Sequence, residues 1–442
     1  MKRWLVVLLV ALAVVVLLSP GIVGWLAEKN LEENIEWAAN ESAGLEIQTQ
    51  SFDRGWFTSE GRHRVILGSA AFHEAAEKYR EKTGNEELPS LIIDTHLDHG
   101  LLPVGSLTRE SGSLMPALAS SVSTFQIDPG DGKLTVLPGA LYSNVSLSGA
   151  TDSRYLLESG NFDIDELRVT WAGAEVALQT DRTDGTLVLD GRIEPFSIAS
   201  GSETIRVGAI AISADQVKSA FGFNVGTAEV SLASFVVESP GSPVTVGAIA
   251  VAADADVQDA RLSVSSKISI DEIIVPGMGD MNFVLDLALK RLDAEAIQII
   301  AEAFNESQRS SDPQAALAGL LPQIEGDLQQ IVASGAEIRI NQLDVTLPQG
   351  KVSTQILVEV PEGDSGAEFS WSSALLKMTA SADVRMPATL FEYVTMMNPQ
   401  ANALLAMGIL QRDGDDYVMH ARYAQGLLNV NGAPMPIPMP GM

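Results

Sequence analysis

The chain has 442 residues, with 28 Lys and Arg against 57 Asp and Glu, which gives a formal net charge of −29 at pH 7. This acidic excess repels the phosphates of nucleic acids and anionic lipids, so it excludes nucleic-acid binding and disfavours adsorption to an anionic membrane surface. The absence of cysteine excludes disulfides and thiolate metal sites. Apolar residues make up 46% of the chain and aromatic residues 6%, so we expect an aliphatic core.

Residues 4–27 contain no charged side chain. As a helix they would span a hydrocarbon core of about 30 Å. Lys2 and Arg3 precede the stretch and acidic residues follow it, so the charge asymmetry predicts a cytoplasmic N-terminus. We therefore expect residues 1–42 to form a transmembrane anchor and a juxtamembrane helix, with the remainder in the bacterial periplasm. The alternative is a cleaved signal peptide with its core at 5–18, but no convincing small-x-small site follows that core.

Residues 43–432 are predicted to form one β-rich domain. Alternating residues at 45–50 and a return arm at 56–67 predict a hairpin that turns at Gly55. Trp56 and Phe57 would face opposite sides of the return arm, so we expect one of them to be buried. A short amphipathic helix is predicted in an insertion at 70–83, before a strand at 90–97.

From about residue 114 to 275 the sequence reads as strands and turns. Residues 262–270 alternate apolar and polar side chains, a pattern typical of an antiparallel strand with one dry face. The segment Val-Gly-Ala-Ile-Ala occurs at 207–211 and again at 246–250, which indicates a meander built by repetition.

The C-terminal third mixes helices and hairpins. Helices are predicted near 293–334, with a break at Pro322, and near 387–411, where Pro387 opens the helix. Further elements are a strand near 376–385 and two hairpins, which pair 338–347 with 352–360 and 417–423 with 427–430. The Pro-rich tail at 433–442 is expected to be disordered, because proline cannot donate to a β-ladder.

These elements predict an α+β fold that is mainly β. An N-terminal transmembrane helix precedes a long, curved, meander-type antiparallel sheet, and C-terminal helices cover the apolar face of that sheet.

One group of residues has the composition of a metal site. Asp94, His96 and Asp98 would share one face of a strand, and imidazole with carboxylates suits zinc or manganese. The wet face of a strand gathers polar side chains by default, so a solvated strand end is the preferred interpretation. His99 is assigned to the following turn.

No motif for nucleophilic catalysis, phosphate binding or dinucleotide binding occurs, so we expect no catalytic residues and no cofactor. Four methionines (Met386, Met396, Met397 and Met407) cluster in and next to the last predicted helix. Core packing is the preferred interpretation of this cluster, and an adaptable apolar surface is the alternative.

Two short motifs follow each other along the chain. One comprises Arg54, Gly55, Phe57 and Ser59, and the other is the sequence Asp98-His99-Gly100. Together with the segments 290–296 and 423–432, they resemble the YdgA-like family of bacterial inner-membrane-anchored proteins of unknown function. The chain departs from the expected pattern after Gly100, where two leucines replace a Pro-Phe pair. The resemblance implies an envelope location and self-association, and it brings no catalytic residues.

Two classes of function follow. The first is a non-catalytic envelope protein that binds or transports lipid acyl chains, or maintains the envelope, as implied by a broad likeness to anchored β-rich proteins of the AsmA type. The second is a metal-dependent hydrolase that uses His96, His99 and nearby carboxylates. A scaffold for protein partners is a further alternative.

Overall fold

The fold is known from a computed structural model, which describes residues 45–67, 81, 84, 87–99, 117–130, 132–164, 167–181, 183–308, 319–320, 322–363 and 369–435. The predicted anchor (1–42) lies outside these residues, as does nearly all of the helical insertion predicted at 70–83. No helix within the described ranges is long and apolar enough to cross a membrane. The sequence predicts one domain over 43–432, whereas contacts divide the chain into two compact units.

Unit 1 comprises Met1–Asn161 and Trp171–Ile193. Its described part is an antiparallel sheet in which each strand pairs with the one that follows it across the sheet. In order of pairing, the strands are β1 (Leu45–Arg54), β2 (Thr58–Leu67), β3 (Ser90–His99), β4 (Ala117–Asp128), β5 (Thr135–Ser146), β6 (Thr151–Leu157), β9 (Ala174–Asp181) and β10 (Thr186–Ile193). The predicted antiparallel meander is confirmed in this unit.

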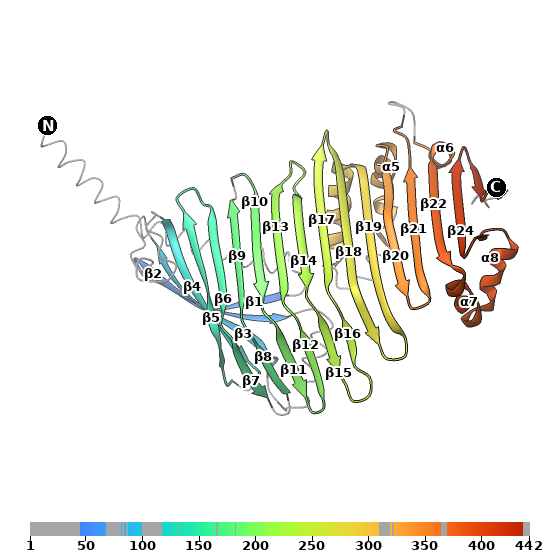
Figure 1. Cartoon of the computed structure of the whole chain (residues 1–442). Helices are drawn as coiled ribbons and strands as arrows, with labels where there is room; N and C mark the ends of the chain where they lie inside the picture. The colour runs from blue at the N-terminus through green and yellow to red at the C-terminus, as the bar shows by residue number, and fades with distance from the viewer. Residues whose placement is uncertain are drawn as a thin grey trace, which may run out of the picture. The chain divides into compact units, whose positions relative to one another are not determined.

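Unit 2 comprises Phe162–Thr170 and Glu194–Met442. Its longest strands run side by side from β13 to β24 in Figure 1. Its strands are β8 (Leu167–Trp171), β11 (Phe196–Ser200), β12 (Glu203–Val207), β13 (Ile210–Lys218), β14 (Asn224–Leu232), β15 (Phe235–Glu238), β16 (Val244–Val246), β17 (Ile249–Gln258), β18 (Arg261–Val275), β19 (Gly279–Asp293), β20 (Glu337–Leu347), β21 (Gly350–Glu359), β22 (Thr379–Pro387), β23 (Gln411–Asp413), β24 (Asp416–Ala424), β25 (Leu427–Val430) and β26 (Ala433–Met435). β7 (Gly160–Ile164) lies at the boundary between the units.

The repeated Val-Gly-Ala-Ile-Ala segments lie at interruptions between consecutive strands of unit 2. Their glycines, Gly208 and Gly247, lie where β12 gives way to β13 and where β16 gives way to β17. Backbone hydrogen bonding continues across both interruptions. The Gly208 amide donates to the Ser234 carbonyl at 2.8 Å, and the Gly247 amide donates to the Glu272 carbonyl at 2.7 Å. A Cβ at Gly208 would lie 2.6 Å from Ser234 Oγ, so the close approach of the two strands requires glycine there. The internal repeat therefore has a structural role, because it places a glycine between two consecutive strands at each position.

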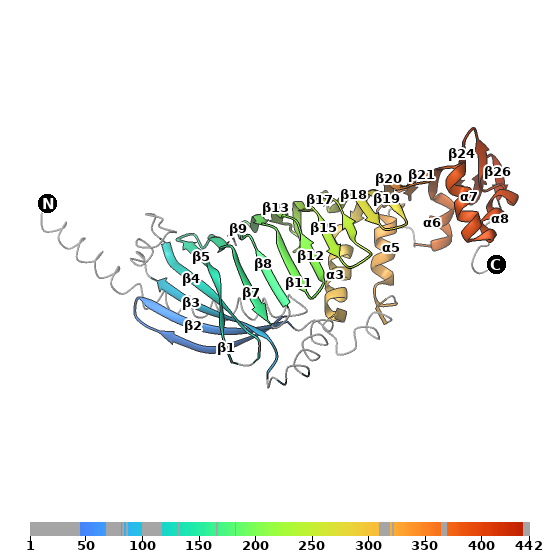
Figure 2. The same cartoon turned by 60° about the horizontal axis from the view of Figure 1, so that its bottom comes forward.

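The helices lie on one face of the unit 2 sheet (Figure 2). α3 and α5 pack against β19, while α7 packs against β21, β22 and β24. The core around Leu262, Leu292 and Ala294 gathers partly buried residues from both helices and the neighbouring strands. The helical elements are α3 (Ala294–Gln308), α5 (Glu325–Ala333), α6 (Trp371–Lys377), α7 (Ala388–Met397), η2 (Pro399–Ala401) and α8 (Asn402–Ala406).

Several predicted boundaries differ from the structure. Residues 322–323 are helical, Ile324 is a bend and α5 begins at Glu325, which agrees with a break after Pro322. The predicted helix at 387–411 is instead α7, η2 and α8, because Pro399 lacks an amide to continue α7. Helix α6 was not predicted.

The start of the Pro-rich tail also differs from its prediction. Residues 433–435 form β26, which pairs with β25. Proline is tolerated in such a strand at the edge of a sheet, and the pairing given for β26 among the described residues is with β25. Residues 436–442 lie outside the described chain.

Candidate functional site

The two motifs meet at one end of β2 and β3 in unit 1. Arg54 ends β1, and the Gly55 amide donates to the Thr58 carbonyl at 2.7 Å. A Cβ at Gly55 would lie 2.8 Å from that carbonyl oxygen, which explains the glycine. The His99 amide donates to the Phe57 carbonyl at 2.9 Å, so the ends of the two motifs are directly hydrogen-bonded. Gly100 lies outside the described residues.

Ser59 and His99 form the buried centre of this junction. Ser59 Oγ lies 3.1 Å from His99 Nε2, and each residue is 1% exposed. A serine within hydrogen-bonding distance of an imidazole has the spacing of a nucleophile and its base. Both side chains are buried, however, and among the described residues neither lines either of the two cavities described below. The pair instead fastens β2 to the end of β3.

The aromatic residues of the first motif differ from their prediction. Trp56 and Phe57 are 54% and 53% exposed, so neither is buried. The physical reason is that β2 begins only at Thr58, which leaves both residues in the turn rather than in a strand whose pleat would bury one side chain.

The metal-site candidates occupy the opposite face of β3. Asp94 and His96 line a shallow cavity of about 560 Å³ together with Arg62 and Glu60. Arg62 holds Asp94 through two hydrogen bonds of 2.6 and 2.9 Å, and this partner raises the pKa of Arg62. His96 lies 3.5 Å from both Glu60 and Asp98.

Asp94 and His96 therefore share a face of β3 as predicted, but the Asp94 carboxylate is hydrogen-bonded to the guanidinium of Arg62. No group of three or more histidines and carboxylates in the described part of the chain is arranged to hold a metal ion. The geometry gives the metal-dependent hydrolase no support.

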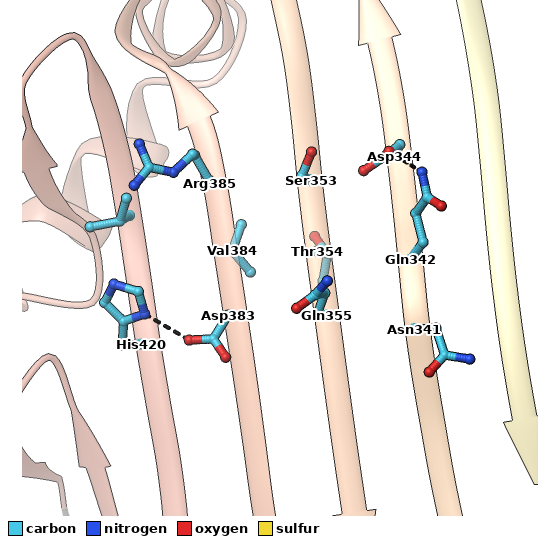
Figure 3. A pocket seen from close by; sticks show the side chains of 11 residues that line it. Asn341, Gln342, Asp344, Ser353, Thr354, Gln355, Asp383, Val384, Arg385 and His420 are labelled. Atoms are coloured by element: carbon cyan, nitrogen blue, oxygen red, sulfur yellow. Dashed lines mark hydrogen bonds and ion pairs between the residues drawn. The ribbon is translucent and has the colours of Figure 1, made fainter.

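A second cavity, of about 380 Å³, lies on the polar face of β20, β21, β22 and β24 in unit 2 (Figure 3). Asp383 in this cavity lies 2.7 Å from His420 Nδ1 and accepts two hydrogen bonds of 3.0 Å from Arg422. Burial by itself raises the pKa of Asp383, but the hydrogen bonds from His420 and Arg422 outweigh it, so the pKa lies below its ordinary value. The carboxylate is ionised and fully engaged.

The other ions of this cavity are paired in the same way. Asp344 contacts Lys351 at 2.7 Å and Gln342 at 2.5 Å, and these partners hold its pKa down against the effect of burial. Arg385 donates to Asp413 and Asp416. Because Asp344 and Asp383 each have a cationic partner that lowers the pKa, neither has the raised pKa expected of a general acid.

The opposite, apolar face of the unit 2 sheet is only partly covered. Register places apolar side chains of successive strands in rows across it. Near α3 and α5 the face is buried, with Leu262 at 6% exposure, but Val251, Val230 and Ile338 are 37%, 45% and 45% exposed. The predicted cover of C-terminal helices is thus incomplete. We call this surface the aliphatic face, and it comprises Ile210, Ile212, Val230, Leu232, Ile249, Val251, Leu262, Val264, Ile268, Ile270, Leu285, Leu289 and Ile338.

The methionine cluster is a second exposed apolar surface. Met396 and Met397 are each 75% exposed and Met407 is 55% exposed, so core packing is the wrong interpretation for these three. α7 buries Ala388, Leu390 and Phe391 at its N-terminal end, and its C-terminal half projects. We call Tyr393, Val394, Met396 and Met397 the Met knob. Helical spacing in the sequence could not distinguish a projecting end from a packed one.

The fold defines the chain, over its described part, as a mostly antiparallel β protein with a few helices. A model of the family described as "Bacterial protein of unknown function (DUF945)" matches residues 1–438, so the chain belongs to that family. The predicted YdgA-like resemblance is thereby confirmed.

One curated relative is Protein YdgA of Escherichia coli (strain K12), which is 22% identical over 327 residues. The alignment covers 67% of this chain and 62% of the relative's length. No solved structure matches the chain.

Proposed function

We propose that this protein is a non-catalytic protein of the bacterial cell envelope that binds lipid acyl chains along its aliphatic face. The proposal includes a tether in the inner membrane through residues 4–27 and a periplasmic location for the β-rich remainder. The apolar, uncharged character of 4–27 supports the tether, and the preceding Lys2 and Arg3 support the orientation.

The observation that carries the proposal is the exposure of Val230, Val251 and Ile338 on one face of a continuous row of strands. Contiguous exposed apolar surface on a soluble domain is unfavourable, at roughly 25 cal/mol per Å², unless a ligand or partner covers it. Acyl chains are a suitable cover because the face is aliphatic and extended, and because the polar residues that alternate with it lie on the opposite side.

Polar residues at β20 show the contrast between the two faces. Glu337 is 4% exposed beneath Arg339 and Arg291, at 2.8 and 3.4 Å, while the adjacent Ile338 on the aliphatic face is 45% exposed. A sheet that buries its carboxylate and exposes its isoleucine is arranged for an apolar ligand on the isoleucine side.

Site-specific photocrosslinking tests this proposal. A benzophenone amino acid replaces Val230 in the full-length chain expressed in bacteria, and mass spectrometry then identifies lipid adducts. The matched control carries the same group at Glu229, the preceding residue, which points to the polar face of the same strand. Adducts with acyl lipids at 230 and none at 229 are expected. Equal yields at both positions, or none at either, would refute acyl-chain binding at this face.

A further inference from the structure

The Met knob is a projecting end of a helix that is firmly attached at its base. Leu390 and Phe391 are 2% and 3% exposed, and the Phe391 ring lies 4.8 Å from that of Tyr417 in β24. From residue 392 to 400 every residue is exposed except Thr395, which is half-buried. The knob is therefore a fixed protrusion in which Met396 and Met397 are each 75% exposed and Tyr393 and Val394 are 42% and 40% exposed.

The sequence around the knob carries almost no charge. Between residues 386 and 410 the only charged side chain is that of Glu392, in a chain with a net charge of −29. Apolar side chains on the aliphatic face alternate with charged ones along the same strands, whereas α7 and α8 contain no charged side chain other than that of Glu392.

We propose that the Met knob inserts into the interfacial region of an uncharged, zwitterionic lipid bilayer. A projecting helix end whose apolar side chains are as open as Met396 and Met397, each 75% exposed, suits immersion in an apolar phase better than docking of one face on a partner surface. Met and Val enter the acyl boundary to a depth of about 5–10 Å, and Tyr393 lies at the headgroup level.

The charge of the protein favours a zwitterionic bilayer over an anionic one. No lysine or arginine lies between residues 386 and 410 to attract anionic headgroups, and the net charge of −29 repels them. A second copy of the chain is a less suitable occupant, because it would cover one side of the knob and would bring another 29 negative charges with it.

The absence of native cysteine allows a single reporter on the full-length chain. Met396→Cys is labelled with the environment-sensitive fluorophore NBD, and the chain is mixed with phosphatidylcholine vesicles that either contain or lack nitroxide groups on the acyl chains. The matched control is Thr227→Cys, which lies on the polar face of β14. Both positions are exposed, so neither substitution disturbs packing.

The expected result is a blue-shifted emission and at least severalfold stronger nitroxide quenching for the label at 396 than for the label at 227. Introducing Met397→Glu beside the label should abolish most of that quenching, and adding phosphatidylglycerol to the vesicles should weaken it. Equal quenching at 396 and 227, or stronger quenching in the anionic vesicles, would overturn the proposal.

A blue shift at 396 that appears without lipid and grows with protein concentration would also overturn it, in favour of self-association through the knob. The test is independent of acyl-chain binding at the aliphatic face. Lipid adducts at 230 without quenching at 396 would refute the knob proposal alone, and the reverse result would refute the proposed function alone.

Discussion

The buried contact between Ser59 and His99 yields the sharpest prediction about the motif residues. Ser59→Ala removes the hydroxyl group that lies 3.1 Å from His99 Nε2 and leaves that buried nitrogen without this partner. The expected loss in the free energy of unfolding is about 1–3 kcal/mol, because a hydrogen bond is lost in a site that is 1% exposed. For a unit of this size, that loss corresponds to a decrease in melting temperature of roughly 2–12 °C.

Denaturant unfolding of the full-length chain, followed by tryptophan fluorescence, measures the effect. The control is Ser51→Ala, an exposed serine on β1, which should change stability by less than about 0.5 kcal/mol. A double-mutant cycle with His99→Gln should give a coupling energy of about 1 kcal/mol. If Ser59→Ala is as stable as Ser51→Ala, the junction is not a structural fastening. Labelling of the wild-type serine by a fluorophosphonate would point to a nucleophile instead.

Three further predictions concern the ligand face, pH and backbone strain. Val251→Asp should lower the amount of co-purified lipid severalfold while costing less than about 1 kcal/mol of stability, because Val251 is already 37% exposed; unchanged lipid content would contradict the proposed function. Burial lowers the pKa of His63, so the unfolded chain binds a proton that the folded chain does not, and stability should fall as pH drops below about 6.5. His63→Gln should reduce that loss between pH 7.5 and 5.5, and an equal loss would exclude His63 as its cause. Gly226→Ala should destabilise by about 2–4 kcal/mol, because φ is +124° and a Cβ would lie 2.1 Å from the Asp215 carbonyl oxygen. Gly326→Ala serves as the control: Gly326 is exposed at the start of α5, and an added Cβ there has no heavy atom within 4 Å. This substitution should stabilise the protein by about 0.5–1 kcal/mol. Calorimetry measures both variants.

Local patterns predicted the strands well. The hairpin of β20 and β21 and that of β24 and β25 lie within one or two residues of their predicted bounds, because alternation and glycine turns act between near neighbours. The antiparallel pairing of β18 follows from its one-sided apolar pattern. The repeated Gly-Ala pairs indicated a repeating unit, although only the structure shows that each pair separates two consecutive strands.

The candidate sites were less predictable. The shared face of Asp94, His96 and Asp98 follows from the alternation of side chains along a strand. The hydrogen bond to Asp94, however, comes from Arg62, which is 32 residues earlier and on another strand. The meeting of Ser59 with His99, 40 residues apart, likewise depends on the pairing of β2 with β3. The sequence shows that the second motif follows the first, but only the structure shows that the two motifs are in contact.

The sequence alone determined the acidic character of the chain, its antiparallel strands and its family membership, because these depend on composition and on spacing between near neighbours. Only the tertiary structure decided which apolar surfaces are covered. Leu390 and Met397 lie on the same short helix, yet one is 2% and the other 75% exposed. The difference arises because burial depends on which strands a helix end reaches, and two of the strands that contact α7, β21 and β24, are not its neighbours in the sequence.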